Sequence, residues 1–338
     1  MENLVKMYIN VAEEINVNFG VDIADKLQEI IDNNPNRVIF FPDGEYKISK
    51  PIMTPADPKF AVSLKLSDFA VIKATEDWDS DEAMIRLGGK LPKNDNLTNG
   101  SNYGLEGGII DCSGIAKGIS IDSGRETYIR NTSIKGAQIG IHIKRGANNG
   151  SSDADLFGIN IVGNWAADSI GILIEGWDNT LTNIRISRIN TGVKLTASGN
   201  MLRNVHPLYY FSNMKGDFSD SVAFDLGAGG NWLDYCYSDQ FSVAFLLDEE
   251  SSPIMQNCFV WYYDKREKVH TGIKTKGKFD AVVNNFKVCF TNPENRNSVL
   301  DVGEAGGQGV FDNLIIGGSE LVNNDAFKEY VKGSYISR

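Results

Sequence analysis

Two short phrases of alternating apolar and polar residues recur along most of the chain. The first phrase has a small residue, an apolar residue, any residue and then another apolar residue. Its copies are Gly118–Ile121, Gly140–Ile143, Gly171–Ile174, Gly192–Leu195, Ala223–Leu226, Ala244–Leu247 and Gly272–Thr275. Successive copies begin 22, 31, 21, 31, 21 and 28 positions apart. Alternation with period two predicts that each copy is a short strand with one face turned inward.

The second phrase lies between copies of the first and carries asparagine at its third position. Its copies are Leu181–Ile186, Met255–Val260, Val283–Val288 and Phe311–Ile316, with looser ones at Ile129–Ile134 and Leu202–Pro207. In Leu233–Ser238 this third position holds Tyr235 instead of asparagine. Because a side-chain amide donates and accepts hydrogen bonds at once, we expect the asparagines to stack as a structural ladder.

Short strands that recur every 20–30 residues are typical of a solenoid. No helical pattern fits between these strands, which excludes βαβ units and leucine-rich repeats. The sequence therefore predicts an all-β, single-stranded parallel β-helix, in which each coil stacks on the last at about 4.8 Å.

The ends of a solenoid expose strand edges and need caps. Val21–Asn33 is predicted to form a helix with Leu27, Ile30 and Ile31 on one side, followed by a strand, a turn and a strand over 37–48. We expect one continuous domain, with an N-terminal arm and capping helix over 1–36 and the β-helix over 37–323. A closing helix or arm over 324–338 would then form the C-terminal cap.

Composition and charge narrow the range of functions. The chain has 33 basic and 44 acidic residues and a net charge of −11, which disfavours binding to a nucleic-acid backbone. No apolar run approaches the roughly 20 residues of a membrane helix. The N-terminus lacks a signal-peptide pattern, which leaves a cytosolic protein, a leaderless export route or a removed leader open. The four cysteines and three histidines have no metal-ligand spacing, so we expect no built-in metal centre.

The segment Val38–Tyr46, followed by coils punctuated by Gly and Asn, resembles the right-handed parallel β-helix proteins of the pectate-lyase-like superfamily. The resemblance covers nearly the whole chain and implies a right-handed solenoid. That superfamily includes polygalacturonases, pectate lyases, fructan-processing enzymes and phage tailspikes, so the resemblance also implies a protein that cleaves or binds polysaccharide. The Asn-Thr-Asp, Asp-Asp and Gly-His-Gly motifs of polygalacturonases are absent, so their catalytic residues cannot be transferred.

The outward positions of the second phrase form the candidate site, because they bring charges, an imidazole and aromatic planes together within about four coils. The predicted register puts Arg203, Asp234 and Gln256 in one column and Arg185, His206, Tyr237 and Phe259 in the next. The candidate catalytic residues are Asp234, Asp239, His206 and Arg203. The candidate substrate-binding residues are Arg185, Tyr209, Tyr210, Tyr237, Phe259 and Trp261.

Glycoside hydrolysis needs two carboxyl groups about 5–9.5 Å apart. On a straight strand Asp234 and Asp239 would be roughly 13–17 Å apart, so they form such a pair only if the strand bends. Asp234 could instead pair with a carboxylate from a loop. A lyase would use a base together with cations that hold the sugar carboxylate, for which Arg203, Arg185 and His206 are suited. The structural alternative for Arg203 and Asp234 is a cross-strand ion pair.

We therefore expect a carbohydrate-active enzyme and favour glycoside hydrolysis over β-elimination. The opposing class is a non-catalytic polysaccharide-binding protein or tailspike-type adhesin, which would form a homotrimer. The expected partner is a polysaccharide or oligosaccharide, with neither nucleic acid nor membrane involved. No cofactor is expected, although a lyase would admit Ca²⁺. We favour an extracellular or virion-associated location.

Overall fold

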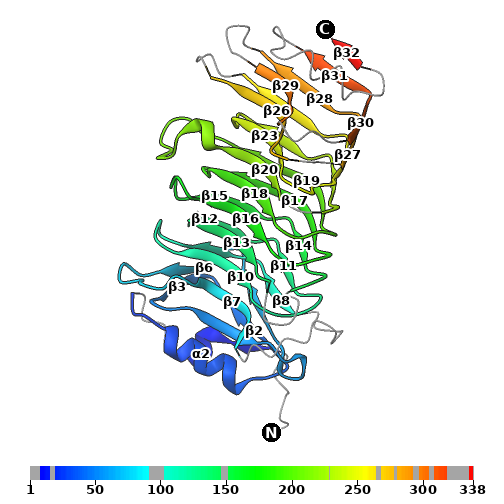
Figure 1. Ribbon diagram of the computed structural model, residues 1–338. Coiled ribbons are helices and arrows are strands. Elements are labelled where there is room, and N and C mark those ends of the chain that lie inside the picture. Colours follow the sequence, from blue (N-terminus) through cyan, green and yellow to red (C-terminus); the bar gives the residue numbers. More distant parts are fainter. Residues whose placement is uncertain are drawn as a thin grey trace. The chain divides into compact units, whose positions relative to one another are not determined.

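The computed structural model describes residues 8–15, 20–90, 103–145, 151–227, 229–263, 268–277, 280–291, 297–303, 308–317 and 335–337. The chain divides into two compact units, Met1–Asn164 (unit 1) and Trp165–Arg338 (unit 2). Both consist of coils whose strands pair in parallel with the strands of the coils next to them, and these strands fall into three rows (Figure 1).

In unit 1 strands of the three rows alternate along the chain. The first row contains β1 (Ile9–Asn10), β2 (Arg37–Phe41), β5 (Val62–Leu66), β8 (Gly104–Glu106), β11 (Tyr128–Arg130) and β14 (Asp155–Phe157). The second row contains β3 (Gly44–Ile48), β6 (Ala70–Ala74), β9 (Ile109–Asp111), β12 (Ser133–Ala137) and β15 (Asn160–Gly163). The third row contains β4 (Ile52–Pro55), β7 (Ala83–Lys90), β10 (Lys117–Ile121) and β13 (Ile139–Ile143).

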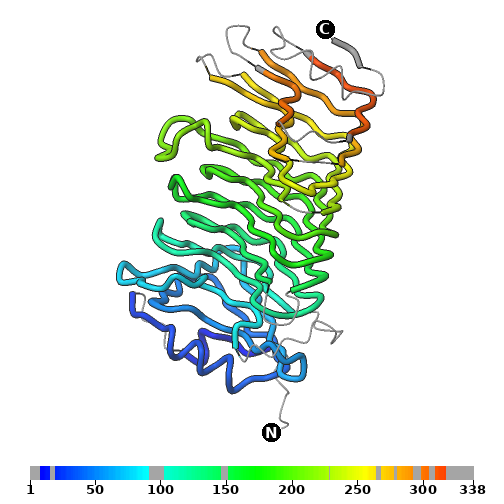
Figure 2. Tube along the Cα trace, viewed as in Figure 1, coloured from blue at the N-terminus to red at the C-terminus, as the bar shows by residue number. Residues whose placement is uncertain are grey.

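Unit 2 repeats this arrangement, and its coils are the green to red turns of the trace in Figure 2. The first row contains β17 (Thr180–Ser187), β19 (Met201–Leu208), β21 (Trp232–Asp234), β24 (Ile254–Gln256), β27 (Asp280–Asn284) and β30 (Gln308–Asp312). β17 and β19 continue into the second row, which also contains β22 (Tyr237–Asp239), β25 (Phe259–Tyr262), β28 (Lys287–Phe290), β31 (Leu314–Gly317) and β32 (Tyr335–Ser337). The third row contains β16 (Ile170–Ile174), β18 (Thr191–Leu195), β20 (Val222–Leu226), β23 (Val243–Leu247), β26 (His270–Thr275) and β29 (Asn297–Asp301).

The predicted parallel β-helix is confirmed. Every copy of the first phrase falls on a third-row strand, and the second phrase spans the first and second rows. The helix predicted over Val21–Asn33 is α2 (Ala24–Asn33), which buries Leu27, Ile30 and Ile31 at the N-terminal end of the coils (Figure 1). A shorter helix, α1 (Val11–Glu14), precedes it, and one-turn 3-10 helices occupy Pro58–Phe60 and Phe218–Asp220.

The predicted domain boundaries stay predictions. The C-terminal cap expected over 324–338 lies mostly outside the described residues, which there comprise only β32. Among the residues that the structure describes, no helix combines the length and the apolar character needed to span a bilayer.

Like residues stack on like residues inside the coils of unit 2. Phe224 lies opposite Phe245 on neighbouring third-row strands, and their rings stack with centroids 4.8 Å apart and an interplanar angle of 5°. Both side chains are fully buried. Because parallel coils keep a fixed register, inward side chains at equivalent positions pack as continuous columns that hold the coils together.

The corner between the first and second rows of unit 2 turns through one residue with positive φ in each coil. Asparagine occupies this position at Asn183, Asn204, Asn257, Asn285 and Asn313, with φ between 51° and 58°. Asparagine tolerates the left-handed region better than most residues. The predicted ladder is visible where Asn204 Nδ2 donates to Asn183 Oδ1 at 2.8 Å and Asn285 Nδ2 donates to Asn257 Oδ1 at 3.1 Å.

Candidate functional site

An open groove of about 670 Å³ lies over this corner of unit 2. Its lining residues come from four successive coils, namely β17, β19, β21–β22 and β24–β25, so the groove runs along the coil axis. They are Thr182, Asn183, Arg203, Asn204, Tyr235, Tyr237, Asn257 and Phe259. Three of the predicted site residues, Arg203, Tyr237 and Phe259, are therefore in the groove wall.

The first predicted column supplies a cation. Arg203 lies opposite Asp234, and Asp234 lies opposite Gln256, as the sequence predicts. Arg203 Nε is 3.7 Å from Asp234 Oδ2, and the two side chains are 63% and 35% exposed. An ion pair this open to water is weak, so the guanidinium remains accessible to a ligand. Arg185, one coil away, directs its guanidinium to main-chain carbonyl oxygens at 3.3 Å.

The second predicted column supplies a group of ionisable side chains around one carboxylate. The His206 ring stacks on Tyr237, with centroids 4.0 Å apart and an interplanar angle of 16°. Tyr237 Oη donates to Asp239 Oδ2 at 3.2 Å, and His206 Nε2 lies 3.9 Å from the same oxygen. Burial and the adjacent Asp239 carboxylate raise the pKa of the Tyr237 phenol well above its ordinary value. The phenol therefore keeps its proton at any ordinary working pH.

Two atoms of this group are buried without a hydrogen-bond partner in the described part of the chain, Asp239 Oδ1 and His206 Nε2. Unpaired polar atoms inside a protein are costly, and where they persist they mark a strained or functional place. The groove thus has a polar group behind Tyr237 whose hydrogen-bonding capacity the coils leave unfilled.

The two predicted catalytic carboxylates have separate surroundings. Asp234 accepts from Asn257 Nδ2 at 3.0 Å and faces Arg203, whereas Asp239 accepts from Tyr237. Each carboxylate therefore has a different neighbour, and the use of Asp234 and Asp239 as a catalytic pair stays a prediction.

The aromatic residues of the predicted site differ in how far their rings are accessible. Phe259 lies 5.0 Å from Tyr237 and 5.8 Å from Trp261, so these three rings form one tilted series beside the groove. Tyr209 is only 3% exposed and packs edge-on against three phenylalanine rings, so its faces cannot receive a sugar. Tyr210 is 43% exposed but contacts Trp165 at 6.3 Å and is not among the groove-lining residues.

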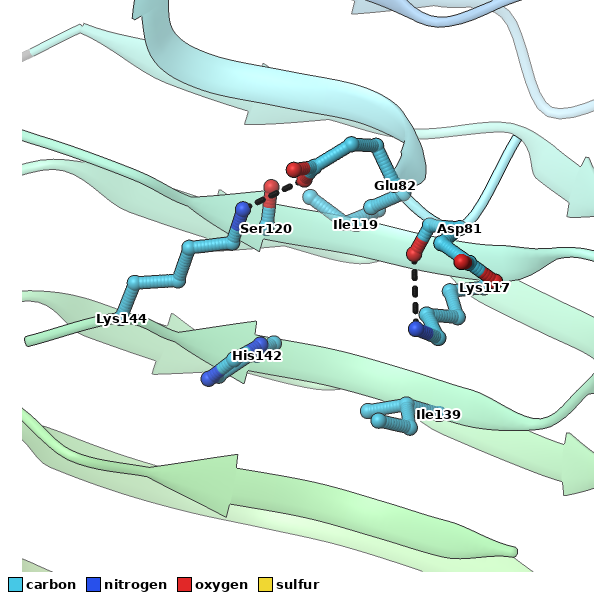
Figure 3. Close-up of a pocket in the computed structure, with 9 residues that line it drawn as sticks. Asp81, Glu82, Lys117, Ile119, Ser120, Ile139, His142 and Lys144 are labelled. Carbon is cyan, nitrogen blue, oxygen red and sulfur yellow. Dashed lines mark hydrogen bonds and ion pairs between the residues drawn. The ribbon is translucent and has the colours of Figure 1, made fainter. Parts of the chain in front are cut away.

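A second pocket, of about 310 Å³, lies on the third row of unit 1 (Figure 3). Its polar lining comes from the loop before β7, from β10, and from β13 and the residue that follows it. These residues are Asp81, Glu82, Lys117, Ser120, His142 and Lys144. Figure 3 shows the ammonium group of Lys144 reaching Glu82, at 2.5 Å, and that of Lys117 reaching the Asp81 carbonyl oxygen, at 2.7 Å.

Behind this pocket Asp122 is the centre of an ion network. Its side chain is 7% exposed and accepts from Arg86 Nε at 2.8 Å and from the Ser120 hydroxyl. Lys144 Nζ is also 3.3 Å from Asp122 Oδ1, so Lys144 bridges Asp122 and Glu82. Because Glu82 Oε2 and Asp122 Oδ1 both contact Lys144 Nζ, these two oxygens are at most 5.8 Å apart.

Sequence reasoning missed the members of this network on or beside β7. Glu82 and Arg86 lie in a stretch that matches neither repeated phrase, so no register could be assigned to them. The missed groove residues are Thr182, Asn183, Asn204, Asn257 and Tyr235. The sequence signal that could have located them is Tyr235, which stands where the other copies of the second phrase carry asparagine. Among the described residues, no group of three or more His, Cys, Asp or Glu side chains is arranged to hold a metal ion.

Comparisons with known proteins agree with the fold. No protein-family model and no curated protein matches the sequence. A solved catalytic domain of a GH87 alpha-1,3-glucanase, in complex with tetrasaccharides, is similar over 100% of this chain and 69% of its own, with 13% identity and a TM-score of 0.63. The A-module of the Azotobacter vinelandii mannuronan C-5 epimerase AlgE6 is similar over 98% and 99%, with 13% identity and a TM-score of 0.59.

A surface adhesin of Streptococcus pneumoniae, PfbA, is similar over 91% of this chain and 90% of its own, with 11% identity and a TM-score of 0.52. At these identities the similarity defines the fold alone. The chain has the parallel β-helix fold that the pectate-lyase-like resemblance implied.

Proposed function

We propose that this chain is a carbohydrate-active enzyme that cleaves an acidic polysaccharide by β-elimination in the groove of unit 2. The observation that carries the proposal is the Tyr237 phenol in the groove wall, held by Asp239 and His206 and one coil from the exposed guanidinium of Arg203. The similarity of the fold to a glucanase catalytic domain and to an epimerase module supports a role in carbohydrate processing by analogy.

Arg203 would bind the substrate carboxylate. It is the charged residue among the eight that line the groove, and the chain as a whole carries a net charge of −11. A guanidinium binds a carboxylate through paired, charge-assisted hydrogen bonds. Neutralising the carboxylate of a uronate makes the adjacent C5 proton easier to remove, because the negative charge that develops at C5 spreads into the carboxylate.

Tyr237 and Asp239 would then move the protons, because Tyr237 lines the groove whereas His206 Nε2 is buried behind it. The Tyr237 oxygen takes the C5 proton while the phenol passes its own proton to Asp239 Oδ2, and the electron pair of the C5–H bond becomes the C4=C5 double bond. The C4–O bond breaks, the leaving oxygen takes the proton that Tyr237 has received, and Asp239 returns its proton to the phenol oxygen. His206 stacks on the Tyr237 ring and holds it in place.

The test is an assay of polygalacturonate, polymannuronate and alpha-1,3-glucan for two products, unsaturated uronate by ultraviolet absorbance and reducing ends by a colour reaction. Unsaturated product from at least one polyuronate is expected. Replacing Tyr237 by Phe should lower kcat by about 100-fold or more, the usual range for losing a general acid, while KM changes little. An unchanged kcat in this variant would remove Tyr237 from the mechanism.

The carboxylate-binding role has a matched control. Arg203→Gln should raise KM for the polyuronate. Lys274→Gln removes an equivalent charge from a pair of similar geometry, since Lys274 Nζ is 3.6 Å from Asp301 Oδ2, but it lies on the third row of unit 2. The control should leave KM unchanged. Equal effects of both substitutions would mean that only the overall charge matters.

Glycoside hydrolysis is the second candidate function, favoured by the Glu82 and Asp122 carboxylates of unit 1. Their oxygens are at most 5.8 Å apart, which is compatible with the separation of about 5–5.5 Å between the two catalytic carboxyl groups of retaining glycosidases. Both carboxylates contact cations, and Asp122 lies behind the pocket rather than in its lining, which makes β-elimination in the groove the better-supported reaction. Reducing ends that form without unsaturated product would establish hydrolysis instead.

A further inference from the structure

Tyr235 occupies a backbone position that suits its side chain poorly. Its φ is 53°, in the left-handed region, where a bulky side chain crowds the following carbonyl group. At the same corner of unit 2 the other positive-φ residues are asparagines, Asn183, Asn204, Asn257, Asn285 and Asn313. The coil containing β21 and β22 therefore carries a tyrosine where its neighbours carry the residue that this turn favours.

The tyrosine also interrupts the ladder of side-chain amides. Asn204 donates to Asn183 on one side, and Asn285 donates to Asn257 on the other. Between these pairs Asn257 directs its amide to Asp234 Oδ1, at 3.0 Å, instead of to an asparagine in the next coil. Tyr235 thus costs local stability through its backbone conformation, and it also breaks the run of contacts between asparagine side chains.

Burial does not compensate for this loss, because the Tyr235 side chain is 57% exposed. It lies in the groove wall, one coil from Arg203 and in the same coil as Tyr237. Unfavourable local geometry that is kept at the surface and next to reactive groups is typical of functional residues. An exposed aromatic ring with amide groups on either side combines a flat apolar plane with directional hydrogen-bond partners, as the binding of a pyranose requires.

We propose that Tyr235 is a sugar-stacking platform and that the groove binds an acidic oligosaccharide lengthwise, parallel to the coil axis. One pyranose ring stacks on Tyr235, the acidic group of a neighbouring sugar pairs with Arg203, and the hydroxyl groups bond to Asn204 and Asn257. This inference names the ligand class of the groove and rests on the proposed function only for the location of the cleavage.

The length of the groove sets a minimum ligand size. The lining residues come from four coils, and the three steps between them cover about 14 Å at about 4.8 Å each. Arg203 and Phe259 are two of these steps apart, about 10 Å, so a single sugar ring cannot contact both. Affinity should therefore increase from the monosaccharide to the trisaccharide and level off at greater lengths.

The test is to replace Tyr235 by Asn and measure both thermal stability and binding. Because asparagine suits the turn and restores the amide ladder, the variant should melt higher than the intact chain, by about 2–4 °C. Trigalacturonate binding, measured by calorimetry, should weaken at least tenfold. Tyr210→Asn is the matched control, since Tyr210 is also exposed, at 43%, but lies outside the groove lining. It should bind trigalacturonate like the intact chain.

A second ligand tests the charge. Trigalacturonate whose carboxyl groups have been reduced to alcohols should bind the intact chain at least tenfold more weakly, and Arg203→Gln should abolish this difference. A Tyr235→Asn variant that binds as tightly as the intact chain overturns the platform. One that melts lower shows that Tyr235 has a structural role and also overturns the inference, as does equal binding of the acidic and reduced ligands.

The outcomes for binding and for catalysis can be separated. Binding with the expected losses but without unsaturated product would support this inference and refute the proposed function. If the intact chain forms unsaturated product and Tyr235→Asn leaves the KM for the polyuronate unchanged, this inference is refuted and the proposed function stays in place.

Discussion

Replacing Asp122 by Asn tests how much the ion network of unit 1 contributes to stability. The carboxylate is 7% exposed and receives Arg86 at 2.5 and 2.8 Å and Lys144 at 3.3 Å. The Asn side chain keeps the shape but leaves Arg86, itself only 21% exposed, without its main counter-charge. Removing one partner of a buried ion pair costs about 3–5 kcal/mol. We expect about 3 kcal/mol, because Glu82 lies 3.5 Å from Arg86 and supplies part of the lost charge.

Asp155→Asn in the same unit is the control. Asp155 pairs with Arg130 at 2.7 and 2.9 Å, so the geometry is alike, but the two side chains are 40% and 42% exposed. An exposed pair contributes about 0–1 kcal/mol. Hydrogen exchange read by mass spectrometry measures local opening around each pair, on β7 and β10 for Asp122→Asn and on β11 and β14 for Asp155→Asn. Equal effects of Asp122→Asn and Asp155→Asn would refute the argument that burial sets the strength of this network.

Three further predictions concern other parts of the chain. Asp22→Ala removes the carboxylate that accepts from the Ala24 N–H at 3.0 Å, and should destabilise α2 by about 1 kcal/mol, seen as faster hydrogen exchange in that helix. Phe224→Ala breaks the fully buried stack with Phe245 and should lower the free energy of unfolding by about 3–5 kcal/mol in a urea titration. Burial raises the pKa of Asp225 above its ordinary 3.8, so the stability of the fold decreases as the pH rises from 3.8 to the folded-state value, and the full loss is present above it. Asp225→Asn should therefore raise the melting temperature at pH 7 and leave it unchanged below pH 3.8; a lower melting temperature at pH 7 would contradict this sign.

The repeats could be predicted because the solenoid imposes the same physical demands on every coil. Each third-row strand needs an apolar inward face, and each corner needs a residue that accepts positive φ. These two demands produce the two phrases. The parallel register then fixes which residues become neighbours, so the contacts between Arg203 and Asp234 and between His206 and Tyr237 follow from sequence spacing alone.

Exposure and pairing at the site depend on features that the repeat does not encode. Tyr209 was predicted to offer a surface plane, but it follows the end of β19, where the chain leaves the strand row and turns the ring into a cluster of aromatic side chains. Glu82 and Arg86 come together with Asp122 through a strand outside both phrases. Tyr235 was visible as an exception to the asparagine pattern, but its place in a groove required the positions of the surrounding side chains.

Proton NMR spectroscopy of a polyuronate during incubation with the intact chain tests the proposed reaction most directly. β-Elimination introduces a carbon–carbon double bond, so the vinyl proton of a 4,5-unsaturated uronate should appear and increase as the polymer shortens. Tyr237→Phe should suppress this signal. Saturated fragments that accumulate without a vinyl signal, or polyuronates that remain intact, would contradict acid–base cleavage in the groove of unit 2.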